Sequence, residues 1–590
     1  MPKYTYRKIE DSDILVKFDG TKIVDFIDAG GNSVLSPAIQ QLGFPINGNT
    51  QGFAQLTYDA YGNVISLGQF PLVNPASIHG ALGDSITKNT VSSVRVLAVP
   101  VVVSGGTGYV LNDGIVLPNG VVLQVTTVSS GAATGVSYVS CGDYTSSGGS
   151  GPVAPSGTQS QVATTGVGSG FSCTIAVKGS GGTNYMYTQG FSTWEQILSD
   201  GKVIYPQQLI WGFGSLGTTE LLAILPQYIA YLKANGANFC TVLIGTNDVQ
   251  LGRTYSTITT NLAQIYAALL GAGIRVKAIP IIPRSYDGTN DHAGSSLAIQ
   301  QAILHVNQFI VRYCQSYNGM YLADPTLNIV DLNVLNTKGY PIPYTMTDTT
   351  TGVVNTAYTY DGLHPSPTGA FFIGKALATL NSVLFPGFTK LVSQADTYDA
   401  SANPTGNLFA NGLVQTTTGG ANSGSATFSG TFLSGFTFNS LNGATAATTI
   451  VGAATTTTLD NGLTRNQQQI TMSSVTDAGS SLKIYKQLFS NYAAGDQIYG
   501  EVEVSISSPS GSILGIWLQV DDGITVARVG QTDTPFVMPN VAWSGLLSTK
   551  NIPITVTTGA GAIEWFLEID LTAAGSSVVV NFSQCSLRKI

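Results

Sequence analysis

From about Ile78 to Val392, with one interruption, short apolar runs alternate with stretches of helical periodicity, and this alternation constrains the fold most strongly. Phe239–Ile244 and Val276–Ile282 are apolar runs that suit buried parallel strands. Two intervening helices are marked by apolar residues at spacings of three and four: Ile258, Leu262, Ile265 and Leu269, then Ile299, Ala302, Ile303, Val306, Ile310 and Tyr313. Gly271 is a stop signal for the first of them. The alternation predicts a parallel sheet covered by helices on both faces.

The interruption runs from about Val94 to Gly182 and is rich in Gly, Ser and Thr. It contains SGGTGYVLNDG and VLPNGVVLQV, which read as strands and turns. A disordered loop is the alternative interpretation, but the runs of Val and Ile favour β structure. We therefore expect an α/β domain built from 76–93 and 183–392, with a β-domain over 94–182 inserted into it.

The flanking segments are predicted to be β-rich. Residues 1–75 contain short alternating runs such as DILVKFDG and indicate a small N-terminal β region. After Val392 the helical signals stop, so we expect a polar linker over 393–412 and a C-terminal β-sandwich over 413–590. Within that tail, DDG at 521–523 separates two apolar runs and predicts a hairpin. We expect the tail to be separable from the α/β domain, and its tryptophans to be core residues: Trp517, Trp543 and Trp565.

The composition excludes several classes of protein. Charged residues make up 10% of the chain, against about 25% in an average soluble domain, and 68 of the 590 residues are glycine. The net charge of -8 argues against a nucleic-acid partner. No stretch approaches the ~18 apolar residues of a membrane span, and the first residues do not resemble a secretory signal. The five cysteines show no metal-ligand spacing, so free thiols and no metal site are expected.

A glycine-rich loop, WGFGSLGTTELL from Trp211, has the G-x-G-x-x-G spacing of a dinucleotide-binding loop. That interpretation requires an acidic residue about 20 positions further on, to hold a ribose. The chain there reads KANGANFC, Lys233 to Cys240, and contains no carboxylate. We therefore expect no nucleotide and no other cofactor.

Three further short motifs lie where the predicted strands end. GDSIT places Ser85 after an apolar run, GTND follows the strand CTVLI, and DGLHP, from Asp361 to Pro365, precedes a predicted helix. The carboxyl ends of parallel strands are where open α/β sheets place their functional residues. A serine hydroxyl needs a neighbouring base, which His364 can supply, and Asp361 can fix the tautomer of that histidine.

With the glycine-rich loop, these four motifs in this order resemble the SGNH (GDSL-like) hydrolase family, over roughly 78–92 and 183–390. The resemblance implies a flavodoxin-like three-layer α/β/α fold and a catalytic triad of Ser85, Asp361 and His364. It also implies an oxyanion hole made by the N–H groups of Ser85 and Gly217 and by the side-chain amide of Asn247. A Cβ at position 217 is expected to crowd the acyl group. GDSI in place of GDSL, and Trp211-Gly212 before the glycine loop, depart from the family pattern.

The flanks suggest where such an esterase acts. The end of the chain resembles the jelly-roll modules that close phage tail proteins, in NPTGNLFANG and SQCSLRKI. We therefore expect a phage tail fibre or tailspike esterase that removes O-acetyl groups from bacterial surface polysaccharide, outside the host cell. A homotrimer bound to other tail proteins is expected, with no nucleic-acid partner and no membrane insertion. The inserted β-domain is expected to overhang the site. The alternatives are a receptor-binding fibre with a catalytically idle hydrolase fold, and a secreted carbohydrate esterase or lipase.

Overall fold

The computed structural model divides the chain into two compact units, 1–76 and 77–590. In the second unit it describes 77–88, 97–142, 157–176, 183–282, 284, 297–335, 341–343, 358–361, 363–385, 396–458, 464–474, 476–477, 479–507, 509, 513–532, 536–554, 562–571 and 574–589. In the first unit it describes five strands: β1 (Tyr4–Lys8), β2 (Leu15–Asp19), β3 (Lys22–Ile27), β4 (Leu56–Tyr58) and β5 (Val64–Leu67). The first three form an antiparallel sheet, and the last two form a hairpin, so the expected β structure is confirmed there.

The centre of the second unit is a six-stranded sheet in which every pairing is parallel. Its strands are β6 (Ser77–Gly83), β15 (Val203–Ile204), β16 (Ile210–Gly212), β17 (Phe239–Leu243), β18 (Arg275–Ala278) and β19 (Met320–Leu322). The order is β15-β6-β17-β18-β19, and β16 also pairs with β6. Because β15 and β16 are successive pieces of one edge, this is the 2-1-3-4-5 order of flavodoxin-like sheets.

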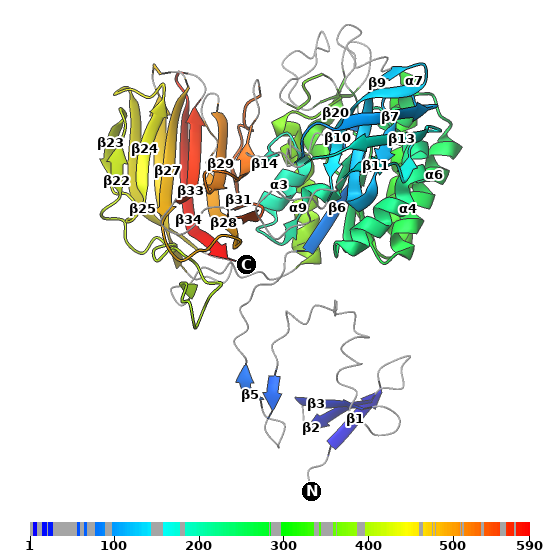
Figure 1. The fold of residues 1–590 in the computed structure, drawn as a ribbon. Helices are drawn as coiled ribbons and strands as arrows, with labels where there is room; N and C mark the ends of the chain where they lie inside the picture. The colour runs from blue at the N-terminus through cyan, green and yellow to red at the C-terminus, as the bar shows by residue number, and fades with distance from the viewer. Residues whose placement is uncertain are drawn as a thin grey trace. The chain divides into compact units, whose positions relative to one another are not determined.

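Helices cover both faces of this sheet (Figure 1). On one face lie α4 (Thr218–Ala234), α6 (Tyr255–Gly271) and α7 (Leu297–Ser316); on the other lie α3 (Phe191–Leu198) and α9 (Pro367–Leu384). Successive side chains of β17 point to opposite faces, so Val242 packs with the first group and Leu243 with α3 and α9. The two helices predicted from apolar spacing are therefore confirmed. Shorter helical segments are α2 (Ser85–Lys88), η2 (Gln207–Leu209), α5 (Thr246–Gln250) and α8 (Thr326–Ile329).

The inserted segment forms two small antiparallel sheets, which we call the inserted β region (97–176). Their orders are β10-β9-β8-β12 and β11-β13-β7. The elements are β7 (Val101–Thr107), β8 (Gly114–Val116), η1 (Pro118–Gly120), β9 (Val121–Ser129), β10 (Ala132–Cys141), β11 (Thr158–Ser160), β12 (Ala163–Thr164) and β13 (Ser169–Thr174). A separate hydrophobic cluster lies between them, so over its described residues this segment is not a disordered loop. A further pair, β20 (Val330–Leu335) and β21 (Pro341–Pro343), is antiparallel.

The C-terminal β region (396–589) contains two larger sheets. One sheet also includes β14 (Thr183–Tyr187), from before α3, and has the order β14-β30-β29-β33-β27-β24-β22. The other has the order β23-β25-β26-β34-β28-β31, and β32 also pairs with β28. Its strands are β22 (Ala421–Ser423), β23 (Thr427–Gly430), β24 (Thr437–Asn442), β25 (Thr448–Thr458), β26 (Thr464–Ser474), β27 (Ser480–Leu488), β28 (Gln497–Ile506), β29 (Ile513–Asp521), β30 (Val526–Gln531), β31 (Trp543–Ser548), β32 (Ile552–Pro553), β33 (Ile563–Leu571) and β34 (Ser577–Lys589). The predicted hairpin at 521–523 is confirmed, because β29 and β30 pair antiparallel on either side of it.

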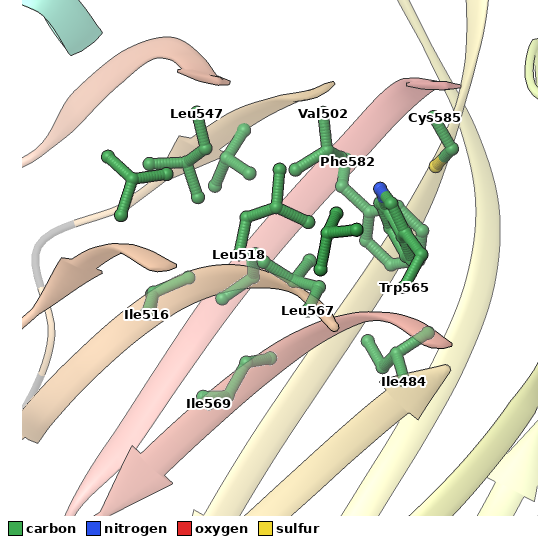
Figure 2. Packing of buried hydrophobic residues seen from close by; sticks show 14 of the residues in the cluster. Ile484, Val502, Ile516, Leu518, Leu547, Trp565, Leu567, Ile569, Phe582 and Cys585 are labelled. Carbon is green, nitrogen blue, oxygen red and sulfur yellow. The ribbon is translucent and has the colours of Figure 1, made fainter. Parts of the chain in front are cut away.

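One hydrophobic core fills the space between the two larger sheets, with Leu518, Trp565 and Phe582 among its members (Figure 2). Trp517, Trp543 and Trp565 are all buried, which confirms that the three tryptophans are core residues. The segment expected to be a linker is also part of this core, since Leu408 and Phe409 are buried in it. The side chain of Asn407 fixes that segment through hydrogen bonds to the Cys585 carbonyl and the Leu587 N–H.

The core of the tail continues into the α/β domain, which argues against the expectation that the tail is separable. Trp194 and Ile197 of α3, and Phe371 of α9, belong to the same hydrophobic cluster as the two larger sheets. Trp194 meets Trp543 edge to face, with 5.5 Å between ring centroids. In addition β14 (Thr183–Tyr187), which immediately precedes α3, pairs in parallel with β30 at the edge of a C-terminal sheet.

Candidate active site

Ser85 lies where β6 ends and the short helix α2 begins, at the carboxyl edge of the central sheet. The preceding residue, Asp84, holds this turn because its Oδ1 accepts a hydrogen bond from the Ile86 N–H at 2.9 Å. The helix lies against the glycine-rich loop: a Cβ on Gly212 would lie 2.2 Å from the Lys88 backbone nitrogen. That glycine is therefore required by the close approach of α2, which gives the G-x-G spacing a reason unrelated to nucleotides.

Asp361 and His364 lie in a tight hairpin just before α9. Its arms are tied by an antiparallel bridge between Thr359 and Pro365 and by a hydrogen bond from the Tyr360 N–H to the His364 carbonyl at 3.1 Å. Within the turn, Asp361 Oδ1 accepts hydrogen bonds from the backbone N–H groups of Leu363 and His364. The hairpin thus fixes the backbone of both functional residues before their side chains interact.

The three side chains form one hydrogen-bonded chain. His364 Nε2 lies 2.8 Å from Ser85 Oγ, and His364 Nδ1 lies 2.6 Å from Asp361 Oδ2. Partial burial opposes ionisation of Asp361, but the hydrogen bonds from His364 outweigh it and lower the pKa of Asp361 to about 2. The ionised carboxylate therefore orients the Nδ1–H of His364 and leaves Nε2 to accept the proton of Ser85.

The two other predicted site residues both have hydrogen-bond partners of their own. Asn247, in the first turn of α5, donates from its amide to the Leu216 carbonyl at 2.8 Å. The Gly217 N–H donates to a carboxylate oxygen of Glu220 at 3.0 Å. The reason given for glycine at 217 is corrected here, since a Cβ would meet Arg253 at 2.6 Å and Asp248 at 2.7 Å. The absent side chain makes room for an ion-pair network.

Asp248 is the centre of that network. It is fully buried and accepts hydrogen bonds from the N–H and the hydroxyl of Thr218, at the start of α4. Arg253 donates to Asp248 at 2.8 Å and pairs with Glu220 as well. Because these bonds join α4 to the loop after β17, they hold the glycine-rich loop close to Asn247. Asp248 therefore positions the backbone of the site.

Burial raises the pKa of Asp84 to about 7, although the Ile86 N–H and the charges of His364 and Arg284 act in the opposite direction. Within the part of the chain that the structure describes, the second carboxylate oxygen of Asp84 is buried without a hydrogen-bond partner. Asp84 therefore keeps the local backbone in place at an electrostatic cost near neutral pH.

The inserted β region contributes a residue that the sequence did not single out. Gln124 of β9 is buried; its Nε2 donates to the Gly214 carbonyl at 2.8 Å, and its Oε1 accepts from Lys88 Nζ at 2.9 Å. It therefore links the inserted β region both to the glycine-rich loop and to the helix that carries Ser85. No local signal could have identified it, because an isolated glutamine in a strand has no motif.

Of the three other histidines, two lie elsewhere in the α/β domain and one lies outside the described residues. His79 is buried against Lys277, 3.1 Å away, at the start of β6, and burial together with that charge lowers its pKa. His305 is exposed on α7, and His292 lies outside the described residues. No cluster of three or more His, Cys, Asp or Glu side chains suited to a metal ion occurs among the described residues. All five cysteines are free, and no described helix has the length and hydropathy needed to cross a membrane.

Residues 164–370 match the sequence model of the GDSL-like Lipase/Acylhydrolase family. The match supports a domain of this family, and with it ester hydrolase activity. The matched segment begins inside the inserted β region and therefore does not include Ser85. In the structure, however, β6, the strand that leads to Ser85, pairs with β16 and β17 of the matched segment. The comparison with curated proteins found no match.

Several solved structures are similar to parts of the chain. A GDSL-like lipase from Bacteroides thetaiotaomicron is 15% identical, with a TM-score of 0.25, over 34% of this chain and 88% of that one. An acetyl xylan esterase is 15% identical, with a TM-score of 0.25, over 32% and 90%. The enzymatically active domain of tailspike protein 4 of bacteriophage CBA120 is 10% identical, with a TM-score of 0.18, over 27% and 20%.

Proposed function

We propose that this protein is a serine esterase that removes O-acetyl groups from a bacterial surface polysaccharide, as part of a phage tail fibre or tailspike. The observation that carries the proposal is the chain of two hydrogen bonds that runs from Asp361 through His364 to Ser85, at 2.6 and 2.8 Å. A serine, a histidine and an ionised aspartate in this order are the groups that acyl transfer needs.

The reaction then has two halves. His364 Nε2 takes the proton of Ser85 Oγ as that oxygen attacks the acetyl carbonyl carbon, and the tetrahedral intermediate forms. The bond from that carbon to the sugar oxygen breaks, and His364 returns the proton to the departing sugar hydroxyl. Water repeats the sequence on the acetyl-serine: His364 accepts its proton, acetate leaves, and Ser85 Oγ recovers a proton. Asp361 stays ionised throughout and stabilises the imidazolium.

The oxyanion hole is proposed from Ser85, Asn247 and Gly217. Among the described residues the Ser85 N–H has no hydrogen-bond acceptor, so it is available to an oxyanion. The amide of Asn247 has two hydrogens, and the bond to Leu216 uses one of them. Gly217 differs, because its N–H must leave the Glu220 carboxylate before it can serve the oxyanion. We therefore propose that the Ser85 N–H and the Asn247 amide bind the oxyanion first. The Gly217 N–H joins them when substrate displaces the Glu220 carboxylate from it.

The substrate class and the setting are supported by the composition and by the flanking regions. Only 10% of the residues of the chain are charged, and Gly, Ser, Thr and Asn are abundant. Such a composition suits a β protein of a virion. The inserted and C-terminal β regions both contact the α/β domain around the triad, which suits an extended polymeric substrate. A homotrimer joined to other tail proteins remains part of this proposal.

The direct test replaces the triad. Ser85→Ala and His364→Ala should each lower kcat for p-nitrophenyl acetate by about 10⁴-fold or more. Matched controls are Ser192→Ala, a buried serine of α3, and His305→Ala, an exposed histidine of α7; both should keep wild-type kcat. Wild-type kcat in a folded Ser85→Ala protein would show that Ser85 is not the nucleophile and would overturn the triad assignment.

The substrate is tested with O-acetylated bacterial polysaccharides, analysed by NMR before and after incubation. Loss of acetyl signals with the wild type, and none with Ser85→Ala, is the expected result. A folded wild type that binds such polymers but releases acetate neither from them nor from p-nitrophenyl acetate would favour the receptor-binding alternative.

Asn247→Ala separates the two roles of that amide. Loss of one oxyanion donor lowers kcat by about 10²–10³. If Asn247 only ties the loop to Leu216, kcat per folded molecule will stay near the wild-type value while the thermal unfolding temperature falls. Asn247→Asp should be the worse of the two variants, because it places a carboxylate where negative charge develops.

A further inference from the structure

An exposed aromatic ring lies directly against the proposed base. Tyr360, on the first arm of the hairpin, stacks on His364 with 5.6 Å between ring centroids and 15° between ring planes. The backbone bond from Tyr360 to the His364 carbonyl fixes the pair. Despite these contacts Tyr360 is 40% exposed, so part of its ring is accessible beside the reacting group.

A second ring comes from the C-terminal β region. Phe536, in the segment that leads to β31, lies 5.2 Å from Tyr360 between centroids, at an angle of 53°. It is partly exposed, and its neighbour Val537 is 43% exposed. The segment is anchored just beyond them, because the buried Met538 donates from its N–H to the Ile513 carbonyl at 2.7 Å. Phe536 is therefore held in a fixed place next to the hairpin.

The two rings, with the exposed Val537 beside Phe536, form a small apolar surface next to polar groups of the proposed site. His364 and Asp361 lie on one side of it. A sugar ring combines an apolar face of C–H groups with a rim of hydroxyls, so it can cover such a surface while its hydroxyls reach polar partners or water. An acyl chain would match the apolar rings but not the polar groups beside them, and an ion would match the polar groups but not the rings.

We propose that Tyr360 and Phe536 form an aromatic platform that holds a sugar ring of the substrate, so that an acetyl group on that sugar reaches Ser85. The inference rests on the proposed deacetylation of a polysaccharide and names the subsite that performs the recognition. The platform is assembled from two regions of the chain, so the C-terminal β region completes the substrate site of the α/β domain.

The experiment compares two substrates in the full-length protein: p-nitrophenyl acetate, and partially O-acetylated oligosaccharides with glucose, galactose or mannose backbones. For the oligosaccharide that the wild type deacetylates fastest, Phe536→Ala should raise KM by about tenfold, the equivalent of one lost aromatic contact. KM for p-nitrophenyl acetate should change much less. Phe536→Tyr, which keeps the ring, should restore the oligosaccharide KM.

Phe489→Ala is the matched control, because Phe489 is a 58% exposed phenylalanine elsewhere in the C-terminal β region; both substrates should be unaffected. Tyr360→Ala should raise the oligosaccharide KM and also lower kcat on both substrates, since Tyr360 positions His364, whereas Tyr360→Phe should resemble the wild type. An unchanged oligosaccharide KM in Phe536→Ala, or equal losses on both substrates, would overturn the platform. A wild type with no activity on any acetylated saccharide would instead overturn the proposed function on which the platform rests.

Discussion

The inserted and the C-terminal β regions are joined to the α/β domain to different degrees. The inserted β region has a hydrophobic cluster of its own, made of residues between Leu97 and Ile175, and its boundary residues Val116, Val122 and Val139 pack into the core of the α/β domain. The C-terminal β region shares one cluster with α3 and α9 and takes β14 into its sheet. Toward the site, the first contributes hydrogen bonds through Gln124, and the second contributes the ring of Phe536.

The difference follows from connectivity. An insertion leaves and re-enters the domain at two points, so two covalent links restrict its position and a few boundary contacts, apolar at Val122 and polar at Gln124, suffice to orient it. A tail has one covalent link, and its placement must come from packing. Burial of apolar area stabilises about 25 cal/mol per Å², so a shared core is the means by which a tail can be held rigidly beside a site. The C-terminal β region is therefore expected to be part of the fold of the enzyme.

The largest expected effect is that of removing the tail. A chain that ends at residue 395 loses β30, the partner of β14, and exposes Trp194, Ile197 and Phe371 to water. We expect it to be insoluble or to lack both cooperative unfolding and hydrolysis of p-nitrophenyl acetate. Circular dichroism melts and esterase assays of refolded material check this. A soluble truncated protein with wild-type esterase activity would show that the shared core is dispensable.

A smaller effect is expected when one aromatic residue is removed from each hydrophobic cluster, the shared one and that of the inserted β region. Trp194→Ala and Tyr109→Ala both remove a buried ring, at a cost of about 3–5 kcal/mol. Trp194→Ala should lower the melting temperature and the esterase activity together, because Trp194 contacts Phe371 and Trp543. Tyr109→Ala should increase proteolysis within the inserted β region while p-nitrophenyl acetate hydrolysis stays near the wild-type rate.

Tryptophan fluorescence makes this comparison specific. The tryptophans of the chain are Trp194, Trp211, Trp517, Trp543 and Trp565, and none lies in the inserted β region. The fluorescence melt of Trp194→Ala should therefore move to lower temperature than that of the wild type, and the fluorescence melt of Tyr109→Ala should stay in place. A large shift of the fluorescence melt in Tyr109→Ala would mean that the two cores unfold as one.

Much of the α/β domain could be predicted from sequence because its signals are local. Apolar spacing located α6 and α7, and short motifs at strand ends located Ser85, Asp361 and His364, which the structure brings within hydrogen-bond distance. The contacts of Phe536 and Gln124 could not be predicted, because they join residues far apart in the chain without any motif. The same holds for Glu220, whose carboxylate occupies the Gly217 N–H, and for the segment 403–412, whose polar turns concealed two core residues.

A moderate effect is expected from the polar link of the inserted β region. Gln124→Ala removes the hydrogen bond to the Gly214 carbonyl and the acceptor for Lys88, so it should lower kcat by about tenfold through a looser glycine-rich loop. Gln161→Ala is the control, because Gln161 bonds to the Phe171 N–H and the Gly168 carbonyl within the same region. Equal kcat values for the two variants would show that the link does not position the loop.

The smallest expected effect concerns one buried carboxylate in each β region. Burial, together with the charge of Glu568 beside it, raises the pKa of Asp570, on β33, to about 8. Burial also raises the pKa of Asp113 in the inserted β region, against the Val110 N–H, and Glu220 of α4 adds to the rise. A folded pKa above the unfolded one means that folding favours the protonated carboxyl. The stabilisation is present below the unfolded pKa and is lost as pH rises toward the folded pKa.

Asp570→Asn and Asp113→Asn remove these titrations and keep an oxygen acceptor. For Asp570→Asn, the melting temperature minus that of the wild type should become more positive between about pH 4 and pH 8, and for Asp113→Asn it should change in the same direction as the pH rises above about 4. The gain should be larger for Asp570, and it should appear in the tryptophan fluorescence melt, because Asp570 lies on the strand that carries Trp565. For Asp113 it should be small and visible chiefly by circular dichroism, since no tryptophan lies within the inserted β region. A fluorescence gain of equal size for Asp113→Asn would contradict two separately stabilised cores, because a charge in the inserted β region would then govern the unfolding of the C-terminal one.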